Sequence, residues 1–191
     1  MIPQIQNNLL HNQKKLTKGE INYKTYLSAN ARLFEGLSKE LIKKACNNVS
    51  LAKYAAEVIS ALKRRKYQVA IVSSNFSPIV ESIANRLNVN ITDSVELVVV
   101  GDHYTGKIAE LSKLHWGTEH VEESFKVAFD RLAKKVRVKY SEIVMVAQSE
   151  KAIPLMRAAG LSVAFKPKSL ELKSIVDKTI SVHAELLAII E

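Results

Sequence analysis

The stretch Val69-Ala70-Ile71-Val72-Ser73-Ser74-Asn75-Phe76 joins a run of apolar, mostly β-branched residues to a short group of small polar ones. The apolar run is continuous rather than alternating, which is typical of a parallel strand covered by helices on both faces. We therefore predict a strand over Gln68–Ser73. Ser77-Pro78 follows at once, and because proline fits the first turn of a helix, this pair predicts a helix that begins there.

A second stretch, Ile143-Val144-Met145-Val146-Ala147-Gln148-Ser149-Glu150-Lys151-Ala152-Ile153-Pro154-Leu155-Met156, repeats the order of strand and helix. It predicts a strand over Glu142–Val146 and a helix over Glu150–Ala159, and Ser162–Phe165 reads as the next strand. Val95–Ile108 reads as a β-hairpin that turns after Val100. Helices alternating with apolar strands indicate an α/β fold with a Rossmann-like open, mostly parallel sheet, assembled through right-handed crossovers.

The first fifty residues differ from the rest because they are polar and helical throughout. One apolar stripe lies around Tyr23 and Tyr26 and consists of Leu27, Ala31, Leu33 and Phe34. Ser38 is placed to cap a helix over Lys39–Cys46, in which Leu41 and Ile42 are expected to face inward. We therefore expect a helical segment over 1–50, followed by an α/β core over 51–191.

Together the two quoted stretches resemble the haloacid dehalogenase-like (HAD) superfamily, closest to its phosphoserine phosphatase branch. In that family the second stretch usually reads Val-Gly-Asp-Gly-x-Asn-Asp-x-x-Met and carries two metal-binding aspartates; the matching positions here are Gln148 and Ala152. The segment 1–50 resembles the small helical cap of phosphoserine phosphatases, through Gly19-Glu20-Ile21-Asn22-Tyr23 and Leu33-Phe34-Glu35-Gly36-Leu37. The resemblance implies a HAD-like core with a helical cap, in which the first core strand is missing.

The resemblance also implies which residues would bind phosphate. An ordinary phosphatase of the family uses an Asp-x-Asp pair, a phosphoryl-binding Ser or Thr, a Lys, and acids that hold magnesium. Ser73 matches the phosphoryl-binding position, Ser74 and Asn75 follow it, and Lys126 is the candidate lysine, one residue off the expected spacing. A serine at a strand end also fits a turn cap, and a lysine on a polar helix face also fits a solvated position.

No Asp-x-Asp occurs in the sequence, and neither of the degenerate metal positions supplies an anionic oxygen. We therefore expect no intact catalytic residue and no metal. Glu150 and Asp93 are the nearest acids, and neither matches a family position. His115, Glu119 and His120 are a weaker metal alternative, because two histidines five residues apart do not share a helix face.

Composition narrows the class of protein. The chain has 191 residues, a formal net charge of +9 and one cysteine, Cys46, for which we expect a buried helical position. Its N-terminus lacks the pattern of a signal peptide. This absence and the single cysteine favour a cytoplasmic localisation. The positive charge favours anionic partners and includes the cluster Lys63-Arg64-Arg65-Lys66, but no nucleic-acid-binding motif accompanies it.

Three functions follow from these observations. The leading hypothesis is a catalytically inactive phosphoserine phosphatase-like protein that binds a phosphorylated small molecule or a protein partner. The alternative is a HAD-type phosphomonoesterase with residual or rearranged activity, which would need Mg²⁺. The second alternative is a basic protein associated with nucleic acid or a ribonucleoprotein. No membrane is expected as a partner, and a homodimer is compatible with all three.

The missing strand has two explanations and one structural consequence. Either the chain is an eroded pseudoenzyme, or an upstream segment has been removed from the sequence. In the resembled family the missing strand lies between the strands that correspond to Gln68–Ser73 and Glu142–Val146. Because unpaired buried backbone groups are costly, we predict that these two strands pair directly, or that another segment or a second subunit fills the gap.

Overall fold

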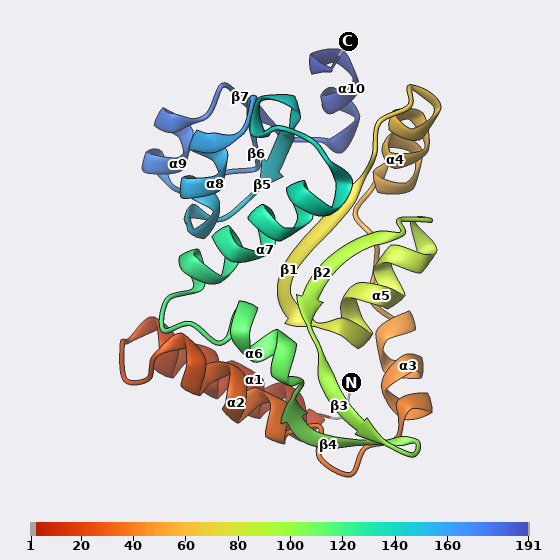
Figure 1. The fold of residues 1–191 in the computed structure, drawn as a ribbon, viewed down its shortest axis with the longest axis vertical. Helices are drawn as coiled ribbons and strands as arrows, with labels where there is room; N and C mark the ends of the chain where they lie inside the picture. The colour runs from red at the N-terminus through yellow and green to blue at the C-terminus, as the bar shows by residue number, and fades with distance from the viewer. Residues whose placement is uncertain (1–2, 191) are drawn as a thin grey trace.

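The computed structural model describes residues 3–190, apart from the side chains at positions 3, 4 and 114. Helices and strands alternate along most of the chain (Figure 1). The α-helices are α1 (Pro3–Thr17), α2 (Tyr23–Arg32), α3 (Lys39–Asn47), α4 (Ala55–Arg64), α5 (Ser77–Arg86), α6 (Glu110–Trp116), α7 (Val121–Val136), α8 (Ile153–Ala158), α9 (Leu170–Ile175) and α10 (Leu186–Ile189). The strands are β1 (Ala70–Phe76), β2 (Ile91–Val95), β3 (Leu97–Val100), β4 (His103–Ile108), β5 (Val144–Ala147), β6 (Leu161–Phe165) and β7 (Lys178–Ile180).

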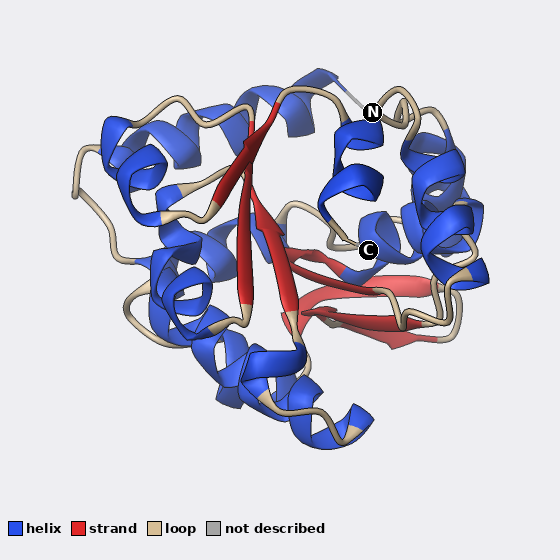
Figure 2. Ribbon diagram, turned by 90° about the horizontal axis from the view of Figure 1, so that it is seen from above, coloured by secondary structure: helices blue, strands red, loops and turns tan. Residues whose placement is uncertain are grey.

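The strands form three separate sheets. β1 and β2 pair in parallel, β5, β6 and β7 form a parallel sheet in that order, and β3 and β4 form an antiparallel hairpin. Viewed from above, helices lie on either side of the strands (Figure 2). The α/β class with mostly parallel strands is therefore confirmed, as is the hairpin.

The predicted direct pairing of Gln68–Ser73 with Glu142–Val146 is wrong. Within residues 3–190, β1 is hydrogen-bonded to β2 alone and β5 to β6 alone, so each of these strands keeps one unpaired edge. Helix α7 contacts β1 and also α8, and it therefore joins the two parallel sheets through side chains rather than through a strand ladder (Figure 1). The alternative, in which another segment or a second subunit fills the gap, stays a prediction.

Several predicted boundaries shift. β1 begins at Ala70 rather than Gln68 and continues to Phe76, with an irregular register against β2 between Val72 and Phe76. The helix predicted over Glu150–Ala159 is divided into a short 3₁₀ turn and α8. β7 was not predicted, because three residues of which two are exposed carry little strand signal. Ser73 to Asn75 therefore lie in the irregular end of a strand instead of in a loop.

The helical segment packs against the hairpin and α6. Its buried side chains share one apolar cluster with Phe76, Val95, the hairpin and Trp116, which is fully buried. Gly106 on β4 has a φ of +71°, and a Cβ there would lie 2.9 Å from the Cβ of Glu35, so only glycine lets the hairpin approach the turn after α2 this closely. We call this cluster the cap–hairpin core.

Other sequence expectations about this segment are met or corrected. Ser38 caps α3, its hydroxyl accepting from the Leu41 amide at 3.2 Å, and Cys46 is buried on that helix. Leu41 is 42% exposed, although the sequence pattern had placed it beside Ile42 on the inner face.

Across the described residues, no helix is long and apolar enough to cross a bilayer.

Candidate anion site at the end of a parallel strand

The end of β1 gathers small polar side chains. Ser73 and Ser74 are half-buried and Asn75 is exposed. The Ser73 Oγ accepts hydrogen bonds from the Asn75 backbone amide at 3.2 Å and from Asn75 Nδ2 at 3.3 Å. The serine thus draws the strand end into a local turn, which places the predicted phosphate-binding residues Ser73, Ser74 and Asn75 side by side.

Helix α5 starts directly after this turn. Phe76 is its N-cap residue and no side chain caps it, while Pro78 occupies the first turn. The first amides of a helix have no partner within the helix, and the helix dipole makes this end electropositive. The carboxyl end of β1 therefore offers hydroxyl and amide donors beside an uncapped N-terminus, which is an arrangement that suits an anion.

Tyr23, the first residue of α2, reaches the same strand end from the helical segment. The residue is 3% exposed, and burial raises the pKa of its phenol well above the ordinary value. The Ser74 hydroxyl lies close enough to lower that pKa in part, yet it completes no hydrogen bond of ordinary geometry with the phenol. The sequence placed Tyr23 only in an apolar stripe, because nothing in the local pattern links positions 23 and 74.

Lys126 lies on an exposed face of α7. Its side chain is 68% exposed and forms an ion pair with Asp130 at 3.3 Å, one turn along the same helix. The Tyr140 hydroxyl donates to the other oxygen of Asp130, and these contacts hold the pKa of Asp130 below its usual range, with the Tyr140 hydrogen bond the largest cause. The contacts of Lys126 within the described chain therefore tie it to Asp130 rather than to the end of β1.

The two degenerate metal positions follow β5. Gln148 is exposed in the bend after the strand, and Ala152 is 5% exposed and packs in an apolar cluster with Ile153 and Met156. Hard divalent cations such as Mg²⁺ require oxygen ligands, and an alanine methyl group in an apolar cluster provides none. The chemistry of these two positions does not fit a magnesium ion.

Asp93, the nearest buried acid, is already engaged. Its carboxylate on β2 is 3% exposed and accepts from Trp116 Nε1 at 3.0 Å and from Arg131 Nε at 2.9 Å. A second Arg131 nitrogen also binds the same oxygen, and Arg131 Nη1 lies 2.6 Å from His115 Nδ1. This network ties β2 to α6 and α7, so Asp93 acts as a structural ion-pair partner, which sequence reasoning missed because its members are far apart in the chain.

The weaker metal alternatives find no support in the geometry. His115 faces Arg131, and the His120 backbone carbonyl accepts from the Thr118 hydroxyl at 2.6 Å. Glu150 is exposed. Among residues 3–190 with described side chains, no group of three or more His, Cys, Asp or Glu side chains is arranged to hold a metal ion.

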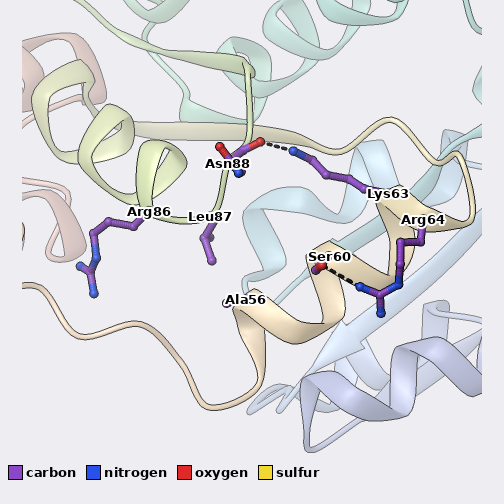
Figure 3. Close-up of a pocket in the computed structure, with 7 residues that line it drawn as sticks. All are labelled: Ala56, Ser60, Lys63, Arg64, Arg86, Leu87 and Asn88. Carbon is purple, nitrogen blue, oxygen red and sulfur yellow. Dashed lines mark hydrogen bonds between the residues drawn. The ribbon is translucent and has the colours of Figure 1, made fainter.

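A shallow pocket of about 420 Å³ lies at the opposite end of β1 (Figure 3). It is lined by one side of α4 and by the end of α5 with the residues that follow it, through Ala56, Ser60, Lys63, Arg64, Arg86, Leu87 and Asn88. Lys63 donates to the Asn88 carbonyl, Arg64 Nη1 donates to Ser60 Oγ at 2.8 Å, and Arg86 donates to the Val49 carbonyl. Lys63 and Arg86 thus each bind a carbonyl just past the end of a helix, and Arg64 binds a side chain of its own helix. Ligands of open α/β sheets bind at the carboxyl ends of strands instead.

Comparison with known proteins decides the family. A family model described as haloacid dehalogenase-like hydrolase matches residues 8–150. The chain belongs to this family. Similar HAD relatives include the phosphoserine phosphatase of Lactococcus lactis, 31% identical over 153 residues, which are 78% of this chain and 66% of the relative. That of Archaeoglobus fulgidus is 27% identical over 169 residues, 88% of this chain and 46% of the relative. The chain thus spans about half to two thirds of the length of these curated relatives.

Solved structures agree with the assignment to the HAD family. A phospho-aspartyl intermediate analogue of phosphoserine phosphatase superposes with a TM-score of 0.74 at 26% identity, covering 97% of this chain and 86% of that chain. A substrate-bound phosphoserine phosphatase complex gives the same TM-score and identity over 96% of this chain and 84% of that chain. The protein is therefore a HAD-fold chain of the phosphoserine phosphatase-like branch.

Proposed function

We propose that this HAD-family chain is catalytically inactive and acts by binding a phosphorylated ligand at the carboxyl end of β1. One observation carries the proposal: the donor-rich turn at Ser73–Asn75, with the uncapped start of α5, stands in a fold whose second polar strand end is degenerate at Gln148 and Ala152. The residues that would bind the phosphoryl group are present, whereas the acids that would bind the metal ion are replaced. A phosphorylated protein partner would use the same contacts as a small molecule.

The proposal that the chain binds phosphate rests on hydrogen-bond donors at the end of β1. The hydroxyls of Ser73 and Ser74, the Asn75 amide group and the first amides of α5 can each donate to phosphate oxygens. Lys126 would add a positive charge if its exposed side chain left Asp130, and an exposed ion pair costs well under about 1 kcal/mol to break. The overall charge of +9 favours the approach of an anion.

The proposal that the chain is catalytically inactive rests on the missing metal-binding acids. HAD-type hydrolysis of a phosphate ester needs a metal ion to organise the phosphoryl oxygens, and the positions that would hold it are a neutral amide and a buried methyl group. No described cluster of acids replaces them. We therefore expect no turnover of phosphoserine or an aryl phosphate above background in the presence of Mg²⁺, and Gln148→Asp alone should create none.

A phosphate titration followed by NMR tests the binding proposal. Amide shifts should be centred on Ser73–Asn75 and the first turn of α5, and Ser73→Ala should weaken binding about tenfold or more, the effect of one hydrogen bond to a charged group. The matched control is Ser60→Ala, a serine that lines the basic pocket, which should leave the affinity unchanged. Shifts confined to Ser60, Lys63 and Arg64 would contradict the proposal and point to the pocket.

The activity assay separates the proposal from its rival. Turnover by a clean preparation that disappears with EDTA would establish the phosphomonoesterase alternative and overturn the inactive assignment. RNA binding that falls steeply with salt, without phosphate shifts at Ser73–Asn75, would favour a nucleic-acid function instead.

A further inference from the structure

The Tyr23 hydroxyl is a buried donor without a partner. Among the described residues it is the one buried side-chain nitrogen or oxygen atom that makes no hydrogen bond. A buried hydroxyl left in this state destabilises a protein by about 1–3 kcal/mol relative to a satisfied one. Native proteins rarely keep such an atom, so its position relative to the candidate anion site is informative.

Its surroundings hold the ring firmly at the end of β1. The Tyr23 backbone amide donates to the Glu119 carbonyl at 3.1 Å, and the Asn22 side chain caps the helix that Tyr23 begins, accepting from the Thr25 amide at 2.9 Å. The ring stacks on Tyr26 with centroids 6.2 Å apart. The phenol therefore points at the strand end from a fixed base, beside the Ser74 hydroxyl.

We propose that Tyr23 is a ligand-binding residue whose phenol donates a hydrogen bond to an anionic oxygen of the phosphoryl group held at Ser73–Asn75. This inference rests on the proposed function and adds a contact from the helical segment to it. The ligand would then lie between two elements, the end of β1 and the start of α2, and would satisfy the orphan hydroxyl.

The protonation state of the phenol supports this role. Burial raises the pKa of Tyr23 well above its ordinary value, so the hydroxyl keeps its proton throughout the neutral range. It is then a donor, and phosphate oxygens are acceptors. Binding should therefore move the Tyr23 amide signal together with those of Ser73–Asn75.

Tyr23→Phe is the decisive variant because it keeps the ring and removes the hydroxyl alone. We expect its dissociation constant for inorganic phosphate to rise about tenfold, since the lost bond is to a charged acceptor. The melting temperature of the free protein should stay unchanged or rise, because the orphan hydroxyl no longer has to be buried. Weaker binding with undiminished stability is a combination that a purely structural tyrosine would not give.

Tyr26→Phe is the matched control. The Tyr26 hydroxyl already has a partner, donating to Gln13 Oε1 at 3.0 Å, so this change should leave phosphate affinity unaltered. If wild type binds phosphate at Ser73–Asn75 and Tyr23→Phe binds it equally well, the inference about Tyr23 is wrong while the proposed function stands. If wild type shows no phosphate shifts there, the proposed function itself fails.

Discussion

The cap–hairpin core and the edge strands of the two parallel sheets bury their apolar side chains to different degrees. In the cap–hairpin core Trp116 is 0% exposed and Leu27 is 2% exposed. In the parallel sheets β1 has several half-buried positions, and Val146 of β5 is 36% exposed. The difference follows the strand edges, because β1 and β5 each lack a neighbour on one side within the described chain. An apolar strand is fully covered only when both edges and both faces are occupied.

The largest expected effect is on the cap–hairpin core. Trp116→Ala should lower the free energy of unfolding by about 3–5 kcal/mol, because it leaves a large cavity and deprives Asp93 of a donor. Urea unfolding followed by circular dichroism measures this loss. Val146→Ala, at the partly exposed edge of β5, should cost less than about 1 kcal/mol. Comparable losses for the two variants would show that β5 is covered in solution, and would remove the contrast.

The second effect concerns the ion pairs of α7. Arg131→Met keeps the apolar stem but leaves the buried carboxylate of Asp93 with the Trp116 indole alone, and should destabilise the protein by about 2 kcal/mol. The value lies below that of a fully buried pair because Arg131 is 42% exposed and water screens its charge.

Lys126→Met is the control for this comparison. It breaks the exposed pair with Asp130 on the same helix, and less than about 1 kcal/mol should be lost. Equal losses in denaturant titrations of the two variants would mean that the Asp93 network does not anchor α7 to β2.

The third prediction tests the open edges directly. Amides of β5 that are not bonded to β6 should exchange with deuterium at least about tenfold faster than Val163 and Ala164 of β6, which is paired on both sides. The same is expected of the free edge of β1. Uniformly slow exchange would indicate that an added strand covers the gap, and a mass measurement in solution would then show whether a second subunit supplies it.

Local patterns predicted most elements but not how the sheets associate. The strand over Ser162–Phe165, the hairpin and the Ser38 cap could be located because each depends on neighbouring residues. The pairing of β1 with β5 was predicted wrongly, because it depends on where α7 packs, and the contacts of α7 with β1 and α8 follow from no local pattern.

The candidate site divides in the same way. Ser73–Asn75 follow an apolar strand and could be named in advance, whereas Tyr23 meets Ser74 only after folding brings α2 to the strand end. The buried partners of Asp93 were missed for the same reason, since Trp116 and Arg131 are 23 and 38 residues away in sequence.

The smallest expected effect comes from removing a hydrogen-bonded carboxylate within the parallel sheets. Asp177, between α9 and β7, accepts from the Ser162 hydroxyl at 2.6 Å and from the Ser162 amide at 2.8 Å. These hydrogen bonds, the hydroxyl first, hold the pKa of Asp177 below its ordinary value. A carboxylate whose pKa is lowered by folding stabilises the protein fully above its unfolded pKa of about 3.9. This contribution disappears as the pH falls through the lower pKa of the folded state.

Asp177→Asn should therefore reduce the urea midpoint slightly at pH 6, and the difference from wild type should narrow in acid. Asp102→Asn, in the turn between β3 and β4, is the matched control outside the parallel sheets and should give a smaller difference at pH 6. A difference for Asp177→Asn that grows as the pH falls would show that the carboxylate, in its charged form, does not fasten β6 to β7.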